Sequence, residues 1–119
     1  MLGFLNRLFV LMVGHAVADF ALQPDAMARG KNRHQRTVPP PGASYQATWF
    51  YWLSAHGLIH GGAVALATGS PLLGALESAC HIAIDFGKCE NWYGIHRDQT
   101  MHLVCKLAWC LLVRKQYDD

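Results

Sequence analysis

Four apolar segments of this chain each carry one pair of ionisable side chains that are four residues apart. The pairs are His15 with Asp19, His56 with His60, His81 with Asp85, and Asp98 with His102. On an α-helix, residues i and i+4 project from one face and can converge on a common point. Four helices that each present such a pair predict a bundle with a polar or metallic centre in its core. The alternative is a set of unrelated buried residues, each satisfied by its own hydrogen bond.

The composition points toward a membrane. Hydrophobic residues make up 52% of the 119 residues and charged residues only 15%, whereas about a quarter of the residues in an ordinary soluble domain are charged. The mean hydropathy of +0.12 is low for a protein with four spans, largely because residues 23–46 form a polar loop. The length suits a single domain over residues 1–119, and the net charge of +2 excludes a strongly basic nucleic-acid binder.

The apolar segments predict an all-α fold, a four-helix up-down transmembrane bundle with a long basic loop between the first two helices. We expect the helices over about Leu2–Leu22, Ser44–Thr68, Pro71–Lys88 and Arg97–Lys115. In the first helix, His15 and Asp19 lie on a narrow polar stripe and the other faces are apolar. That pattern is typical of a helix in lipid whose polar stripe faces neighbouring helices.

The loop after the first helix is rich in basic residues, namely Arg29, Lys31, Arg33 and Arg36, and then in prolines. Lys and Arg concentrate on the cytoplasmic side of membrane proteins. We therefore expect residues 24–43 to be cytoplasmic and both termini to lie across the membrane, although Arg114 and Lys115 work against this orientation. A solvated connector with no further role is the alternative.

The second helix begins with an aromatic run, Trp49 to Trp52. Such a run is typical of the membrane–water interface, and an aromatic cluster in a core has the same pattern. The glycines at 57, 61 and 62 follow, and small residues in this position predict the close approach of a neighbouring helix.

In an up-down bundle the first and third loops fall at the same end. Three of the four pairs lie near those loops in the sequence, so we expect them at one level. His56 and His60 are expected two to three turns inside the second helix, about 10–15 Å at 1.5 Å per residue. This order predicts a single shared site that opens toward the cytoplasmic face.

The eight paired residues supply five imidazoles and three carboxylates. One tetrahedral zinc takes three or four protein ligands, so the set suits two divalent ions. Zinc is favoured by the imidazole content, with manganese or iron as the alternative. A paired-metal site generates hydroxide near neutral pH and holds a phosphoryl or carbonyl oxygen. Glu77 is a candidate either for supporting a metal ligand from behind or for the general base, and Lys106 is a candidate for stabilising an anionic transition state. Either residue could instead neutralise a neighbouring charge.

Four stretches of the sequence resemble the motifs of a known protein family. They are the run His15 to Gln23 followed by Asp25, Met27, Ala28 and Lys31; the run His56 to Gly61; the run His81 to Asp85 with Lys88; and Asp98-Gln99 with His102. Together they resemble the domain-of-unknown-function 3307 family of bacteria and phages over nearly the whole chain. The resemblance implies a small multi-spanning protein of the bacterial inner membrane. The paired residues are also similar to those of membrane-bound metal-dependent hydrolases and, more distantly, of helical zinc phospholipases C and single-strand nucleases.

We therefore expect a metal-dependent hydrolase of the bacterial inner membrane, with a dinuclear His/Asp site and a phosphoester or lipid substrate. The first rival is a non-enzymatic small membrane protein, encoded by a phage or mobile element, that acts by partner binding or ion passage. The second rival is a soluble helical protein whose apolar faces are covered in a larger oligomer. The expected partners are the lipid bilayer and a second copy of the chain or another membrane protein, with no nucleic acid.

Overall fold

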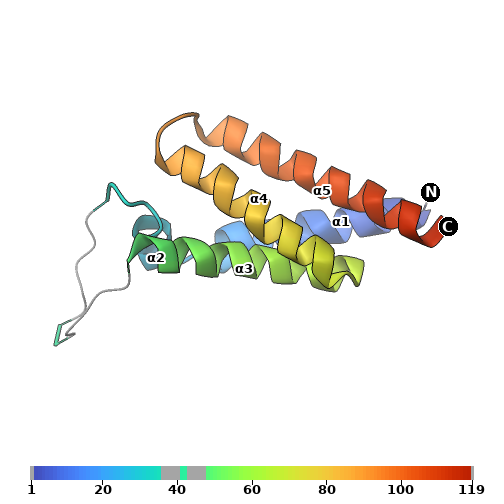
Figure 1. Ribbon diagram of the computed structural model, residues 1–119, viewed down its shortest axis with the longest axis horizontal. Helices are drawn as coiled ribbons and strands as arrows, with labels where there is room; N and C mark the ends of the chain where they lie inside the picture. Colours follow the sequence, from blue (N-terminus) through green and yellow to red (C-terminus); the bar gives the residue numbers. More distant parts are fainter. Residues whose placement is uncertain (1, 36–40, 43–47, 119) are drawn as a thin grey trace.

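The computed structural model describes residues 2–35, 41–42 and 48–118, with side chains over 3–35, 41–42 and 48–113. Regular structure over these residues is entirely helical (Figure 1), which confirms the predicted all-α class. Arg36 and the predicted helix start at Ser44 lie outside the described residues. The elements are α1 (Leu2–Ala16), the π-helical segment η1 (Val17–Ala21), α2 (Asp25–Gly30), α3 (Trp49–Thr68), α4 (Pro71–Cys89) and α5 (Ile95–Asp118).

The four long helices run alternately up and down the bundle (Figure 1). The start of α1 and the end of α5 lie together at one end. The short helix α2, the start of α3 and the turn between α4 and α5 lie at the opposite end, which we call the loop end. The first and third connections therefore fall at the same end, as the sequence predicted. The helix α2 itself was not predicted, because it lies within the polar loop.

A tight turn joins α3 to α4 and sets them side by side. Gly69 ends α3 with a φ of 71°, a left-handed conformation that glycine adopts without strain. Ser70 caps α4, because its Oγ accepts a hydrogen bond from the backbone N–H of Leu73 at 3.3 Å. Pro71 occupies the first turn of α4, where its missing N–H costs no helical hydrogen bond.

Glycines allow α3 and α4 to pack closely. A Cβ atom at Gly61 would lie 1.9 Å from Ser78 Oγ and 2.5 Å from the carbonyl oxygen of Gly74, both on α4. Gly57 also faces α4 side chains, whereas a Cβ at Gly62 would meet nothing within 4 Å. The predicted close approach is thus confirmed at Gly57 and Gly61. It brings the histidines of α3 against α4.

One of the described helical stretches, Gly3–Ala21, is long and apolar enough to cross a membrane by length and composition. The prediction of four such spans is therefore not confirmed by this criterion. The ionisable residues of the four pairs are the reason. Each of α3, α4 and α5 carries histidine or charged side chains at intervals of four residues, and these lower the mean hydropathy of the helix.

The interior of the bundle changes character along its length. Near the termini an apolar cluster joins the long helices, formed by Leu11, Val64, Leu73, Trp109, Cys110 and Val113. Toward the loop end the buried side chains are polar, and all eight residues of the four pairs are buried there. Large apolar side chains instead lie exposed on every long helix, for example Phe9, Leu58, Leu72 and Val104. In an ordinary soluble domain, by contrast, apolar side chains lie mostly inside and charged side chains mostly outside.

Substitution at Gly61 tests the close contact between α3 and α4. Gly61→Ala should lower the free energy of unfolding by about 1–3 kcal/mol, because the added methyl group forces the two helices apart. Gly62→Ala is the matched control, since its methyl group enters open space and alanine favours a helix over glycine by about 1 kcal/mol. Thermal unfolding of both variants under the same conditions measures the difference. Equal unfolding temperatures for the two variants would contradict the contact.

Candidate metal centre

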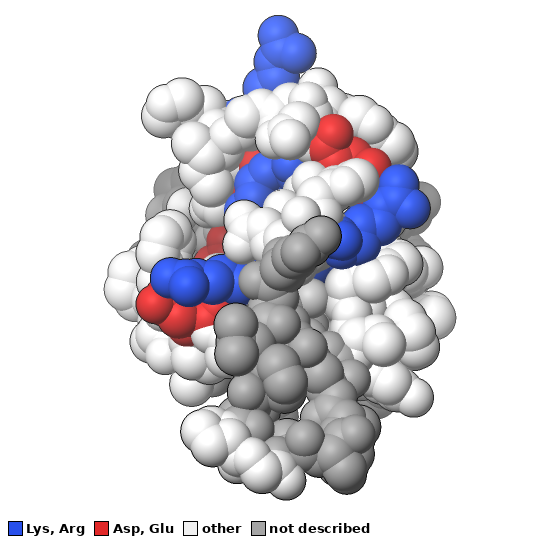
Figure 2. All heavy atoms as spheres, turned by 90° about the vertical axis from the view of Figure 1, so that its left-hand side faces the viewer, with Lys and Arg blue, Asp and Glu red and all other residues white. Residues whose placement is uncertain are grey.

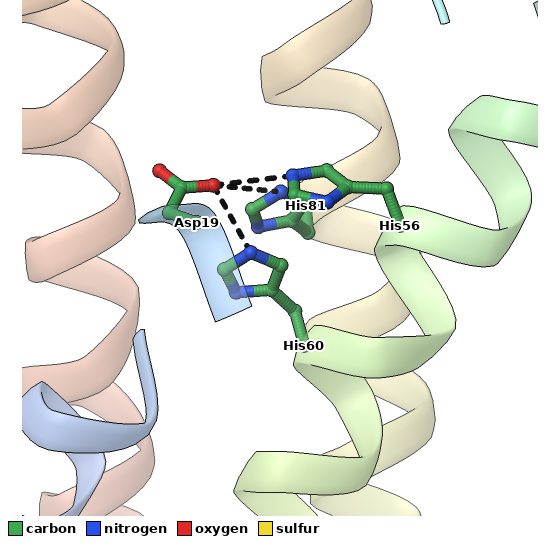
Figure 3. Close-up of side chains that lie close together, drawn as sticks. All are labelled: Asp19, His56, His60 and His81. Carbon is green, nitrogen blue, oxygen red and sulfur yellow. Dashed lines mark hydrogen bonds and ion pairs between the residues drawn. The ribbon is translucent and has the colours of Figure 1, made fainter. Parts of the chain in front are cut away.

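Asp19 is the point at which three histidines from two other helices meet (Figure 3). Its Oδ1 atom lies 3.1 Å from Nε2 of His56 and 3.1 Å from Nε2 of His60, both on α3. It lies 4.0 Å from Nε2 of His81 on α4. One potential ligand atom from each of these four residues lies within 4.8 Å of all the others. We call these four residues the first group.

The position of Asp19 depends on an irregular turn at the end of the first helix. In η1 the backbone N–H of Leu22 donates to the carbonyl oxygen of Val17 at 2.8 Å, five residues back. A π-helical turn of this kind contains more residues than an α-helical turn, and such turns are common at functional sites. The wider turn shifts Asp19 around the helix axis from the place that α-helical spacing gives it. His15 Nε2 nevertheless stays 3.6 Å from Asp19 Oδ2.

Asp85, Asp98 and His102 form a second group beside the first. Asp98 Oδ1 lies 3.3 Å from His102 Nε2 on the same helix. Asp85 Oδ2 lies 3.6 Å from His56 Nε2 and 3.9 Å from His81 Nε2. Asp85 therefore lies between the two groups, and all four predicted pairs contribute to one polar core.

Gln99 ties His15 and the two groups together. Its Oε1 lies 2.9 Å from His15 Nε2, and its Nε2 donates to Asp19 Oδ2 at 2.7 Å and to Asp98 Oδ2 at 3.2 Å. His15 itself lies outside both groups and is held through this amide. The spacing of ionisable residues could not single out Gln99, because its side chain is neutral; its only sequence signal was its place in the fourth family-like motif.

The histidine rings pack as one cluster. The ring centroids of His60 and His81 are 3.6 Å apart and those of His81 and His102 are 4.1 Å apart, both in stacked pairs. The His15 ring lies 5.3 Å from that of His60. Rings from all four long helical stretches are thus in mutual contact, which a set of unrelated core histidines would not produce.

His56 and His60 lie about two to three turns inside α3, at the depth that the sequence predicts, and the histidine rings of α3 and α4 are in contact at this level. His56 lies seven residues after the start of α3 at Trp49, and His81 lies eight residues before the end of α4 at Cys89. At 1.5 Å per residue, both are therefore about 10–12 Å from the loop end. His81 therefore lies two turns before the end of α4 rather than directly beside the α4–α5 turn.

Some buried atoms in these groups lack the hydrogen bonds that burial requires. His81 is 0% exposed, and neither of its ring nitrogens has a hydrogen-bond partner among the described residues; Asp98 Oδ1 has none there either. His81 Nε2 instead faces Asp19 and Asp85 at 4.0 and 3.9 Å, too far for hydrogen bonds. Buried polar atoms without partners are costly, so a cation between them would stabilise the cluster.

The contacts of Asp19 are close to the spacing of ligand atoms around a tetrahedral ion. Around a zinc ion with bonds of about 2.0–2.1 Å, neighbouring ligand atoms lie about 3.3–3.4 Å apart. The Oδ1 atom of Asp19 lies 3.1, 3.1 and 4.0 Å from the three imidazole nitrogens, which brackets that value. Three imidazoles and one carboxylate are also a donor set that zinc accepts.

Glu77 and Lys106 lie on the opposite side of the His81 ring. Lys106 Nζ pairs with Glu77 Oε1, and Trp109 Nε1 donates to Glu77 Oε2 at 2.5 Å. Glu77 Oε1 lies 3.6 Å from His81 Nδ1. Both oxygens of the Glu77 carboxylate are therefore engaged, and the carboxylate faces the ring nitrogen of His81 that points away from the first group. This arrangement suits the orientation of His81, as carboxylates behind metal-binding histidines commonly provide.

Lys31 is a site residue that the ionisable spacing missed. Its side chain is only 3% exposed, and its Nζ donates to Asp85 Oδ2 at 2.5 Å. Lys88 Nζ approaches the other oxygen of Asp85 at 3.7 Å. Lys31 follows the short α2 directly, and six residues are too few for helical periodicity to reveal which side faces inward. Its only sequence signal was its place in the first family-like motif.

The buried charges do not balance. The buried carboxylates among the described residues are Asp19, Glu77, Asp85 and Asp98, and the buried lysines are Lys31 and Lys106. With neutral histidines, four negative and two positive charges leave a net charge of −2. An uncompensated buried charge costs several kcal/mol even after relaxation. One divalent cation would offset this charge.

Glu90 clamps the segment after α2 to the end of α4. Arg33 donates through Nε to Glu90 Oε1 at 2.5 Å and through Nη2 to Oε2 at 2.9 Å, while His34 Nε2 lies 3.0 Å from Oε2. These hydrogen bonds lower the pKa of Glu90 to about 2. Because Arg33 and His34 closely follow Lys31 in the chain, the clamp holds Lys31 near Asp85.

The chain matches the family model described as Protein of unknown function (DUF3307) over residues 7–117. It therefore belongs to this family, and the resemblance drawn from its motifs is confirmed. The matched range includes both groups, the Gln99 bridge and the Glu90 clamp. No curated protein and no solved structure matches the chain. The family description states no activity.

Replacing Glu90 by glutamine tests the clamp through its pH dependence. A lowered pKa means that the fold favours the ionised carboxylate. The resulting stability is present above the ordinary pKa of 4.5 and is lost as the pH falls toward about 2. Glu90→Gln should therefore lower the unfolding temperature at pH 7, and the difference from wild type should shrink between pH 4.5 and 2. Thermal unfolding across this range measures it.

Asp25→Asn is the matched control for the clamp, because Asp25 forms an exposed ion pair with Arg29 at 3.8 Å. Exposed pairs contribute little stability, so this variant should stay close to wild type at every pH. A difference between wild type and Glu90→Gln that is constant across the pH range would contradict the clamp.

Proposed function

We propose that this protein is a multi-span protein of the bacterial inner membrane whose helical core binds divalent metal ions and hydrolyses a phosphoester. The observation that carries the proposal is the convergence of Asp19, His56, His60 and His81 on one buried point. Three separate elements, η1, α3 and α4, supply these residues. So many ionisable groups remain buried together only when their charges and hydrogen-bonding atoms are compensated.

The inverted polarity of the bundle supports insertion in a membrane. Apolar side chains cover the outside of all four long helices, whereas the charged side chains of the four pairs lie inside. In lipid, ionisable residues of a spanning helix face the interior of the bundle and pair with one another. Hydropathy averaged along a helix does not distinguish these two faces. For that reason α3, α4 and α5 are proposed spans beside the Gly3–Ala21 stretch.

The charge distribution supports an orientation with the loop end in the cytoplasm. Five of the ten basic residues belong to described segments at this end: Arg29, Lys31, Arg33, Lys88 and Arg97. Figure 2 shows this end face-on, with basic side chains spread over it beside a few acidic ones. Excess Lys and Arg mark the cytoplasmic side. The loop of residues 24–43 is therefore proposed to be cytoplasmic.

The two groups suit different tasks. The first group offers four donors, which fill the coordination of a tetrahedral zinc ion, as in structural sites. The second group, Asp85, Asp98 and His102, offers three donors, and catalytic zinc sites keep three protein ligands and an open position. We assign hydrolysis to the second group, which lies nearer to the α4–α5 turn. An ion there supplies Lewis-acid activation of water and of a phosphoryl oxygen.

The side chains around the two groups have supporting roles in this proposal. Gln99 holds the Asp19 and Asp98 carboxylates at a fixed separation through its amide nitrogen. Glu77 and Lys106 act as positioning residues behind His81, because their polar atoms are engaged with each other and with Trp109. Of the two roles that the sequence suggested for Glu77, this proposal keeps the support of a metal ligand rather than the general base.

Nearly complete burial of both groups favours a second candidate, a non-enzymatic membrane protein that binds or passes a metal ion. The side chains of His56, His81 and Asp98 are at most 1% exposed. A closed site retains an ion well but admits a substrate only through an opening. Both candidates bind a metal ion, and only the enzyme hydrolyses a substrate.

Metal content tests the proposal shared by both candidates. Protein purified in detergent without added metal or chelator should contain zinc, measured by inductively coupled plasma mass spectrometry. His60→Ala removes a ligand of the first group and should weaken binding at that group at least tenfold. His96→Ala is the matched control, because His96 is exposed and belongs to neither group. The absence of metal from wild-type protein, or equal content in both variants, would overturn the metal proposal.

Turnover separates the two candidates. Wild-type protein should hydrolyse at least one of a phosphomonoester, a phosphodiester and a phospholipid, and a chelator should abolish the activity until zinc is restored. Asp98→Asn should abolish hydrolysis while the first group keeps its metal. Metal-loaded protein that hydrolyses none of these substrates would overturn the enzyme and favour the ion-binding protein.

A further inference from the structure

A cavity of about 360 Å³ opens at the loop end, beside the second group. It lies between the segment after α2, the end of α4 and the α4–α5 turn. Its polar lining includes two lysines and four side-chain amides, from Lys31, Lys88, Gln23, Asn32, Gln35 and Asn91. Among the described residues, no carboxylate contributes to this lining. A cavity lined by ammonium and amide groups suits an anion with several oxygen atoms.

We infer that this cavity binds the phosphoryl group of the substrate, with Lys88 and Lys31 as its cationic contacts. The inference rests on the proposed function, because it names the substrate class of the same site. Both lysines contact Asp85, a member of the second group, at 2.5 Å for Lys31 and 3.7 Å for Lys88. A phosphoryl group held by these ammonium groups therefore lies next to the residues assigned to hydrolysis.

The two lysines differ in how firmly they are engaged. Lys31 is almost fully buried in its short ion pair with Asp85, whereas the Lys88 side chain is 28% exposed and more distant from the carboxylate. Lys88 therefore has donors free of close contact with Asp85 and faces the cavity. Ammonium groups are common phosphate ligands in proteins.

With an ion in each group, charge balance also favours a dianion. The buried carboxylates and lysines leave a net charge of −2, so two divalent ions would change it to +2. An excess of positive charge in a bundle interior is costly, and a phosphoryl dianion next to the second group would offset it. A neutral substrate would leave the charge uncompensated.

Binding of inorganic phosphate to zinc-loaded protein in detergent, freed of excess metal, tests the inference by equilibrium dialysis. Lys88→Met should weaken phosphate binding at least tenfold, and Lys88→Arg should restore most of it. Arg29→Met is the matched control, because Arg29 forms an exposed ion pair and does not line the cavity; its affinity should stay within twofold of wild type. All three variants should keep the zinc content and unfolding temperature of wild type.

The outcomes distinguish this inference from the proposed function. Wild-type protein without zinc would overturn the proposed function and the inference that rests on it. Protein that holds zinc but binds phosphate equally in wild type and Lys88→Met would overturn the cavity assignment alone. A similar loss in Arg29→Met would also overturn it, because the effect would then reflect general surface charge.

Competition identifies the source of the phosphoryl group. Bound phosphate should be displaced by a soluble phosphomonoester, glycerol 3-phosphate, and by mixed micelles that contain phosphatidic acid, while micelles with diacylglycerol should have no effect. Stronger displacement by phosphatidic acid would assign a lipid headgroup, and stronger displacement by the soluble ester a soluble substrate. Failure of both phosphomonoesters to displace phosphate would contradict the inference.

Discussion

The buried charges in the polar half of the bundle have to be compensated by their neighbours. Among the residues that the structure describes, four carboxylates and two lysines are buried in the bundle together with five histidines, although burial disfavours each charge. Each carboxylate has a cationic, imidazole or amide neighbour, and Asp19 has three such contacts through its two oxygens. Because these neighbours come from different helices, the ion pairs and hydrogen bonds that compensate the charges also fix the relative positions of the helices.

Backbone features bring these side chains within reach of one another. Close packing at Gly57 and Gly61 places the histidines of α3 against α4, and the π-helical turn of η1 directs Asp19 toward both. The Glu90 clamp holds the segment that carries Lys31 over Asp85. With the polar groups inside, the apolar side chains are left on the outer surface, which is the surface that lipid would cover.

The sequence predicted the parts of this site that depend on local geometry. The i+4 spacing placed each ionisable pair on one helix face, and the short connections placed three pairs at the same end, so the convergence of His81, Asp85 and Asp98 could be foreseen. Lys31 and Gln99 could not be identified by that spacing, because their roles depend on tertiary packing. The π-helical turn leaves no periodic signal. Four membrane spans were predicted from apolar faces, whereas the averaged hydropathy criterion supports one, Gly3–Ala21.

In this proposal the first group binds a metal through three imidazoles and one carboxylate. Zinc K-edge X-ray absorption on protein loaded with one equivalent of zinc tests it most directly, because it reports the ligands themselves. We expect nitrogen and oxygen ligands at about 2.0–2.1 Å from the zinc ion, with the outer-shell scattering of three imidazole rings. The chain also has four free cysteines. A sulfur ligand at about 2.3 Å from zinc, or a spectrum without imidazole scattering, would contradict zinc binding by the first group.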